Sequence, residues 1–259
     1  MEKVAQPDHW DRLAEAYEKT GHPHTAVYAE TALSYVPLSQ EQKVLDVAAG
    51  TGALALAAAR TGAQVVATDF SAAMLARIEN ARLPNVQVAV MDGQALTLAD
   101  DAFDAVFSIF GVFMFPDWRK GLSEMARVTR PGGHGVVATW QGRGAGAYLL
   151  LGQLISEMFP EQPLSPFPEG ARLLSDAGRF AEELESAGYR DPRIHAVTRA
   201  FPVERATLDS TETLFHSTPD WNELNEKQRS EILAEIKCRM GDEPRLDIPS
   251  TALIGVAKK

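Results

Sequence analysis

The sequence has almost no cysteine, with Cys238 alone among 259 residues. One thiol cannot form an internal disulfide, and no set of cysteines and histidines has the spacing of a zinc site, so we expect no metal. A surplus of positive charge is also missing, because 25 lysines and arginines face 35 aspartates and glutamates, for a formal net charge of −10. Domains that bind DNA or RNA usually carry a basic face, so nucleic-acid substrates are disfavoured.

Long hydrophobic runs are absent too. No apolar stretch approaches the roughly 20 residues that a membrane-spanning helix requires. The first residues, Met1 to Gln6, do not resemble a signal peptide. The composition, 45% hydrophobic and 23% charged, is ordinary for a globular protein. We therefore expect a cytoplasmic protein without a membrane span.

The most informative segment that is present runs from Val44 to Gly52. It is an apolar stretch with one acid near its end, followed at once by a glycine-rich turn and then by strong helix formers from Ala53 to Arg60. This pattern predicts a strand, a tight turn and a helix, the first half of a βαβ unit. Glycines let a backbone approach a ligand closely, and a helix N-terminus offers free N–H groups. The turn is therefore a candidate ligand-binding loop.

Two kinds of nucleotide ligand compete for this loop. The segment Gly50 to Ala55 matches the dinucleotide pattern G-x-G-x-x-G/A, which is a weak signal alone. Asp46 stands four residues before Gly50, and its carboxylate would repel a pyrophosphate. S-adenosylmethionine carries a sulfonium and an α-amino group and no phosphate, so it suits Asp46 better. The alternative is that Asp46 only caps nearby backbone.

Two later predicted strands also end in an acid, Asp69 and Asp92. The tip of the second strand in a βαβ arrangement meets the ribose, and the Asp69 carboxylate can accept hydrogen bonds from both ribose hydroxyls. Asp92 could accept from the adenine amino group, although an acid before Gly93 can also be a simple turn residue. Ser71 is expected to cap the helix that follows Asp69.

With these motifs in this order, the chain resembles the class I S-adenosylmethionine-dependent methyltransferases, and most of all their small-molecule branch, which includes ubiquinone- and menaquinone-biosynthesis enzymes. The family's usual first loop glycine is replaced by Ala48, which we expect to have a negative φ. The resemblance implies an α/β fold, a Rossmann-like seven-stranded, mostly parallel sheet with helices on both faces. It covers about residues 8–141, through Val44–Gly52, Thr68–Leu75, Met91–Ala95, Phe103–Val106 and Leu122–Gly133.

The resemblance also implies how the chain is organised. Residues 1–259 would form one domain, with residues 1–40 as a helical lid, 41–141 as the cofactor-binding core, and 142–175 and 205–245 as helical insertions over the acceptor site. The lid is predicted as two helices separated by a turn at residues 20–24. Together, the motifs and the resemblance predict S-adenosylmethionine as the cofactor, bound by Tyr17, Asp46, Ala48, Gly50, Gly52, Asp69, Phe70, Met74, Asp92, Gly93 and Ser108.

Methyl transfer from a sulfonium is an in-line displacement that depends mainly on positioning the acceptor. A phenol, enol or amine acceptor must also lose a proton, and a histidine is the natural base near neutral pH. His24 and His22, in the expected lid turn, are the predicted catalytic residues, and His216 is a weaker candidate.

Apolar residues after the fourth and fifth predicted strands suggest the acceptor class. About half should pack in the core, and the others could line a pocket for a flat, apolar molecule. We expect O- or C-methylation of an aromatic, quinone-like or polyketide-like small molecule, by a monomer or a homodimer. The alternatives are a rearrangement or cyclisation that uses the cofactor's charge, a non-catalytic cofactor-binding protein and, more distantly, a dinucleotide oxidoreductase. The residues concerned are Phe110, Val112, Phe113, Met114, Phe115 and Trp140.

Overall fold

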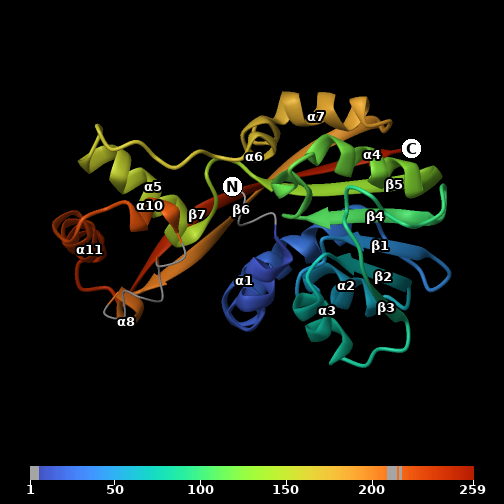
Figure 1. The fold of residues 1–259 in the computed structure, drawn as a ribbon, viewed down its shortest axis with the longest axis horizontal. Helices are drawn as coiled ribbons and strands as arrows, with labels where there is room; N and C mark the ends of the chain where they lie inside the picture. Colours follow the sequence, from blue (N-terminus) through green and yellow to red (C-terminus); the bar gives the residue numbers. More distant parts are fainter. Residues whose placement is uncertain (1–5, 209–214, 216–217) are drawn as a thin grey trace. The chain divides into compact units, whose positions relative to one another are not determined.

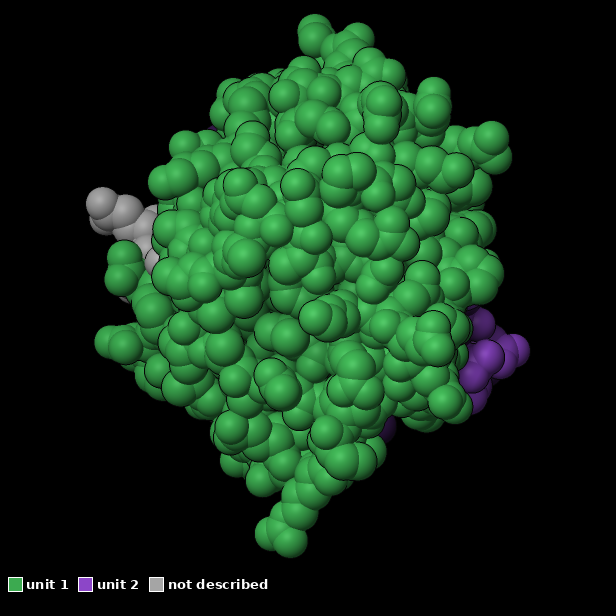
Figure 2. All heavy atoms as spheres, turned by 90° about the vertical axis from the view of Figure 1, so that its right-hand side faces the viewer, with its two compact units in different colours: residues 1–139, 168–197, 252–259 green, residues 140–167, 198–251 purple. Residues whose placement is uncertain are grey.

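The computed structural model describes residues 6–208, 215 and 218–259. The chain divides into two compact units, coloured separately in Figure 2. Unit 1 comprises residues 1–139, 168–197 and 252–259, and unit 2 comprises residues 140–167 and 198–251. No helix among the described residues is both long enough and apolar enough to cross a membrane.

The strands form a seven-stranded sheet in the order β3-β2-β1-β4-β5-β7-β6 (Figure 1). The pairs from β3 through β5 are parallel, so the predicted mostly parallel α/β architecture is confirmed. The strand order reverses beside β1, which pairs with β2 on one side and β4 on the other. The strands are β1 (Lys43–Val47), β2 (Gln64–Asp69), β3 (Val86–Val90), β4 (Phe103–Ile109), β5 (Thr129–Trp140), β6 (Arg190–Glu204) and β7 (Arg245–Lys258).

The helices of unit 1 follow from local sequence signals. Ser71 caps α3 as predicted, because its hydroxyl accepts a hydrogen bond from the Met74 N–H at 3.2 Å. Asp176 caps α7, because its carboxylate accepts a hydrogen bond from the Arg179 N–H at 2.9 Å. The helices are α1 (Pro7–Tyr35), α2 (Ala53–Ala59), α3 (Ala72–Glu79), the 3₁₀ turn η1 (Val112–Met114), α4 (Trp118–Val128), α6 (Glu169–Leu174) and α7 (Ala177–Ser186).

The predicted turn at residues 20–24 is wrong, because α1 continues through it as one helix of 29 residues with Pro23 inside. Proline removes one helical hydrogen bond, but the Thr25 hydroxyl donates to the carbonyls of Gly21 and His22 in the same turn. The second half of α1 also buries Tyr28 completely. Tertiary packing of this kind outweighs a local helix breaker, and α1 packs along α2 and α3.

Unit 2 has its own hydrophobic core. It is built by α5 (Gly146–Met158), α8 (Arg205–Leu208), α10 (Pro219–Asn222) and α11 (Glu226–Met240). Leu151 and Leu154 of α5 and Ile232 and Ile236 of α11 are buried in it together with Trp221. The two segments predicted as insertions, 142–175 and 205–245, therefore supply most of this second core, while residues 168–175 belong to unit 1.

Candidate functional site

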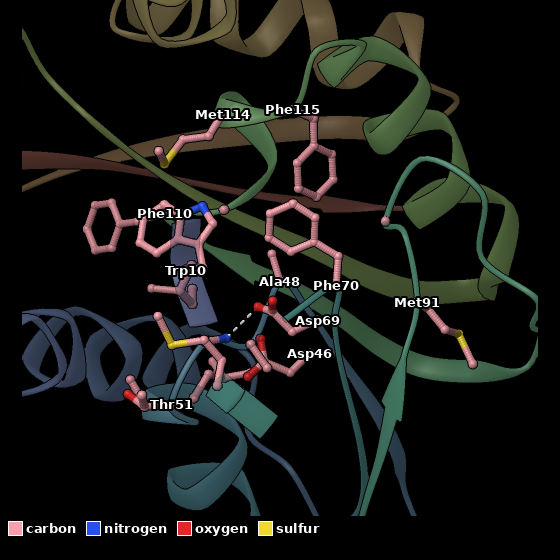
Figure 3. A pocket seen from close by; sticks show the side chains of 18 of the residues that line it. Trp10, Asp46, Ala48, Thr51, Asp69, Phe70, Met91, Phe110, Met114 and Phe115 are labelled. Carbon is pink, nitrogen blue, oxygen red and sulfur yellow. Dashed lines mark hydrogen bonds between the residues drawn. The ribbon is translucent and has the colours of Figure 1, made fainter. Parts of the chain in front are cut away.

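A cavity opens in unit 1 beyond the carboxyl ends of β1, β2 and β4 (Figure 3). Its empty volume, counted out to its mouth, is about 1040 Å³. This edge of the sheet is where the strand order reverses, and open α/β sheets bind their ligands at such points. The cavity is therefore the candidate functional site, and α1, the loop after β1 and the segment after β4 supply most of its walls.

Three carboxylates line the cavity, those of Asp46, Asp69 and Asp92. Among the described residues, no lysine, arginine or histidine lines it. A pyrophosphate would meet carboxyl groups and no cationic side chain here, whereas a cationic ligand would favour the ionised form of these carboxyl groups. The charge of the lining thus favours the cationic nucleoside over the dinucleotide.

Asp46, near the end of β1, is buried with 1% of its surface exposed. Its Oδ2 accepts a hydrogen bond from the Ala55 N–H of α2 at 3.0 Å. Burial raises the pKa of this carboxyl to about 8, and the nearby Asp69 adds to the rise. Asp46 therefore caps backbone and also lines the cavity.

Asp69, at the end of β2, supports the loop after β1. Its Oδ2 accepts from the Gly50 N–H at 2.9 Å, the hydrogen bond dashed in Figure 3, and its Oδ1 accepts from the Ser71 N–H at 2.9 Å. Burial raises the pKa of Asp69, and these hydrogen bonds counteract part of the rise. The Asp69 carboxylate thus accepts hydrogen bonds from the loop after β1 and from the N-cap residue of α3, and it also lines the cavity.

The loop backbone corrects one expectation about Ala48. Its φ is +56°, in the left-handed region, and not negative as expected from the sequence. Gly50 and Gly52 also have positive φ, and a Cβ on Gly52 would lie 2.7 Å from the Ile78 side chain. Ala48 and Gly50 line the cavity, whereas Gly52 is not among the lining residues and its missing Cβ leaves room for the Ile78 side chain of α3.

The strain at Ala48 can be tested by mutation. Ala48→Gly should raise the free energy of unfolding by about 0.5 kcal/mol, because relief of the left-handed strain slightly exceeds the entropy that glycine adds to the unfolded chain. Ala48→Val should lower it by about 2 kcal/mol, because a β-branched residue fits this conformation worst. Urea denaturation measures both changes. Equal stability of the two variants would contradict the assigned backbone conformation.

The turn after β3 carries Asp92 and Gly93, and both line the cavity. The Oδ1 of Asp92 accepts from the backbone N–H of Gln94 at 2.9 Å, so the turn-residue interpretation is also correct. A Cβ on Gly93 would lie 2.6 Å from the Phe115 ring, so only glycine allows that ring to rest on the turn.

The remaining lining is apolar. Of the residues proposed after β4, Phe110, Met114 and Phe115 line the cavity, whereas Val112 and Phe113 are buried without lining it. Trp140 belongs to unit 2 and is not among the lining residues. Phe70 and Met74 line the cavity as predicted, and Tyr17 does so from α1.

Several lining residues were not predicted, including Trp10, Thr25, Met91 and Gln94. Trp10 packs edge-on against Tyr17, with 6.1 Å between ring centroids. The sequence signal for Trp10 was its place on the same helical face as Tyr17. Gln94 lies in the family-matching segment Met91–Ala95, but nothing in the sequence indicates its contact with Asp117, 23 residues away.

The predicted catalytic histidines are not brought to the cavity, since neither His22 nor His24 is among its lining residues. The His22 Nδ1 instead lies 2.9 Å from the Thr51 hydroxyl, and burial lowers the pKa of His22. Ser108 is also not in the lining, because its buried hydroxyl accepts from the Val112 N–H. His216 lies outside the described residues. Within the described part of the chain, no group of three or more potential ligands is arranged to hold a metal ion.

Comparison with known proteins gives consistent results. A family model described as a methyltransferase domain matches residues 44–133. A demethylmenaquinone methyltransferase of Mycolicibacterium gilvum is 35% identical over 178 residues, 62% of this chain and 74% of that protein. Another of that name, from Corynebacterium efficiens, is 48% identical over 101 residues, 39% of this chain and 43% of that protein. The match thus spans less than half of the second relative.

Solved structures share the fold. A Bacillus halodurans C-125 protein described as a candidate methyltransferase superposes with a TM-score of 0.61 at 18% identity, covering 89% of this chain and 98% of that one. The cyclase SpnF superposes with a TM-score of 0.54 at 19% identity, covering 90% and 81%. At such low identity these likenesses concern the fold alone.

Proposed function

The chain belongs to the class I S-adenosylmethionine-dependent methyltransferases, and we propose that it methylates a small aromatic, quinone-like acceptor at oxygen or carbon. The observation that carries this proposal is the cavity at the sheet's reversal point, lined by three carboxylates and, among the described residues, by no cationic side chain. The names of the demethylmenaquinone methyltransferase relatives support the quinone-like class.

The residues present fit S-adenosylmethionine. Asp69 lies at the strand tip where a ribose is expected, and its carboxylate can accept from two hydroxyls. Asp46 offers a carboxyl group at the loop, and the amino and sulfonium groups of the ligand would favour its ionised form. Phe70 and Met74 provide apolar surface for adenine, and Asp92 provides an acceptor for its amino group. The bound cofactor would supply an electrophilic methyl group.

The protein's own contribution to the reaction is mainly placement. The apolar rings of Phe110 and Phe115 exclude water and orient a flat acceptor. Phe110 has φ +63°, and its ring packs edge-on against the buried Tyr28 with 5.4 Å between centroids. A bulky residue with a positive φ is typical of functional sites, where the surrounding structure holds a strained backbone so that the side chain has a defined position.

Mutation can test whether His22 or His24 acts as the general base, since neither residue lines the cavity. We expect His24→Ala to keep kcat within about threefold of wild type, whereas loss of a general base typically costs about 10²–10⁴. His22→Ala should also spare kcat and should raise the Km for the cofactor, since it removes the contact with Thr51. A hundredfold loss of kcat in either variant would restore that histidine as the base.

The proposed function is tested first by binding and then by turnover. Calorimetry should detect binding of S-adenosylmethionine and none of NAD⁺. The protein is then incubated with methyl-labelled cofactor and a panel of phenols, reduced naphthoquinones and amines. Transfer of label with release of S-adenosylhomocysteine supports the proposal. Product formation without that release identifies a rearrangement or cyclisation, and binding of NAD⁺ alone overturns the assignment.

A further inference from the structure

Gln94 joins two segments that line the cavity from different parts of the chain. Its Nε2 donates to the Oδ1 of Asp92 at 2.9 Å, and its Oε1 accepts from the Asp117 N–H at 2.8 Å. Asp117 is the N-cap residue of α4, where its own carboxylate accepts from the Lys120 N–H. An amide has one donor end and one acceptor end, and both are used here, which fixes the orientation of Gln94.

The two carboxylate oxygens of Asp92 differ in their hydrogen-bond partners. The Oδ1 takes two hydrogen bonds from Gln94, from the backbone N–H and from the side chain, each at 2.9 Å. Among the described residues, no donor reaches Oδ2. A carboxylate held in this way presents one oxygen that accepts and cannot donate.

A second contact fixes the same turn. The Phe115 ring rests where a Cβ of Gly93 would stand, and the same ring occupies the Cβ position of Gly121 in α4. The turn at residues 92–94 and the segment at 115–117 are therefore joined by a packing contact and by the Gln94 amide. Removal of the amide alone would leave the turn in place and leave the Asp92 carboxylate with one hydrogen bond, from the backbone N–H of residue 94, so it could rotate more easily.

We propose that Gln94 is a positioning residue that holds the Asp92 carboxylate as a fixed acceptor and so selects a 6-aminopurine over a 6-oxopurine in the ligand. This inference rests on the proposed function. An amino group donates to a fixed carboxylate oxygen, whereas a 6-oxo group places an acceptor against it and leaves both unpaired. A carboxylate held only by the backbone N–H of residue 94 can turn toward solvent more easily, so it both attracts the amino group less and repels the oxo group less.

The test compares S-adenosylhomocysteine with its 6-oxo counterpart, S-inosylhomocysteine, by calorimetry. We expect wild type to bind S-adenosylhomocysteine about tenfold more tightly than S-inosylhomocysteine. Asp92 is exposed, so this ratio should be smaller than the ratios found for fully buried hydrogen-bonding sites. Gln94→Ala and Gln94→Met should both lower the ratio to about threefold or less, because only the backbone N–H of residue 94 then holds Oδ1. Gln94→Met keeps most of the volume, so it separates the lost hydrogen bonds from lost packing.

A matched control is Thr97→Val. Thr97 lies on the same segment and contacts the Met91 sulfur, not Asp92, so its ratio should remain that of wild type. If the Gln94 variants weaken both ligands equally, Gln94 has only a structural role and the inference is overturned. Equal binding of both ligands by wild type overturns it too. If wild type binds neither ligand, the proposed function itself fails.

Discussion

Replacement of Asp69 by alanine should weaken the binding of S-adenosylmethionine about a hundredfold or more. Hydrogen bonds to a charged group contribute about 1.5–3 kcal/mol each, and a carboxylate at this position can accept two from a ribose. The variant also loses the acceptors for the Gly50 and Ser71 N–H groups, so the loop is less well ordered before the ligand binds. Isothermal titration calorimetry with the purified protein measures the dissociation constant.

The control is Asp104→Ala, at the opposite end of the sheet. Asp104 accepts from the Lys43 N–H at 2.7 Å and pairs with Arg130 at 2.8 Å, so its loss should lower the melting temperature. The affinity for S-adenosylmethionine should stay within about threefold of wild type, since sites this far apart act almost independently. Unchanged affinity in a folded Asp69→Ala protein would remove the ribose assignment.

The strand-turn-helix core of the site could be predicted because its signals are local. The apolar run before Gly50, the helix formers after it and the serine cap at Ser71 each specify an element from neighbouring residues. The sequence also predicts that three carboxylates lie close together, those of Asp46, Asp69 and Asp92, because the carboxyl ends of parallel strands lie at one edge of the sheet. The structure places all three around one cavity.

The features that escaped prediction depend on distant parts of the chain. The positive φ of Ala48 cannot be deduced from an alanine, which ordinarily avoids that region. The continuity of α1 across Pro23 depends on packing against α2 and α3. The bridge of Gln94 to Asp117 joins residues separated by 23 positions, and nothing in the local pattern signals it.

The histidines show the limit of reasoning from residue type. His22 and His24 were proposed as bases from their expected place in a lid turn, but that turn is helical. A helix fixes the direction of each side chain, and His22 contacts the lining residue Thr51 without lining the cavity itself. The apolar residues after β4 divide as expected, because Val112 and Phe113 pack in the core while Phe110, Met114 and Phe115 line the cavity.

Asp46→Asn should stabilise the free protein and weaken cofactor binding at the same time. The folded pKa of Asp46, about 8, lies far above the usual value of 3.8. Below pH 4 the carboxyl is protonated in both the folded and the unfolded protein, and its contribution to stability is full. As the pH rises to about 8 the unfolded protein ionises first, so this contribution is lost. A pKa difference of about four units between the folded and unfolded states corresponds to at most about 6 kcal/mol of unfolding free energy. Because the folded protein relaxes around the ionised carboxylate, we expect the variant to be more stable than wild type by about 3 kcal/mol at pH 8. The asparagine oxygen can still accept from the Ala55 N–H.

The same change should remove a pH dependence of binding. In wild type, a cationic ligand favours ionised Asp46, so the affinity for S-adenosylmethionine should rise by up to about tenfold per pH unit between about pH 5.5 and 6.5, at least one unit below the pKa of an α-amino group. In Asp46→Asn the affinity should be weaker and nearly constant over that range. Calorimetry across the range and urea denaturation at pH 8 measure both effects. A variant that keeps the wild-type slope would show that the proton is taken up elsewhere, with Asp69 as the nearest candidate because burial raises its pKa too.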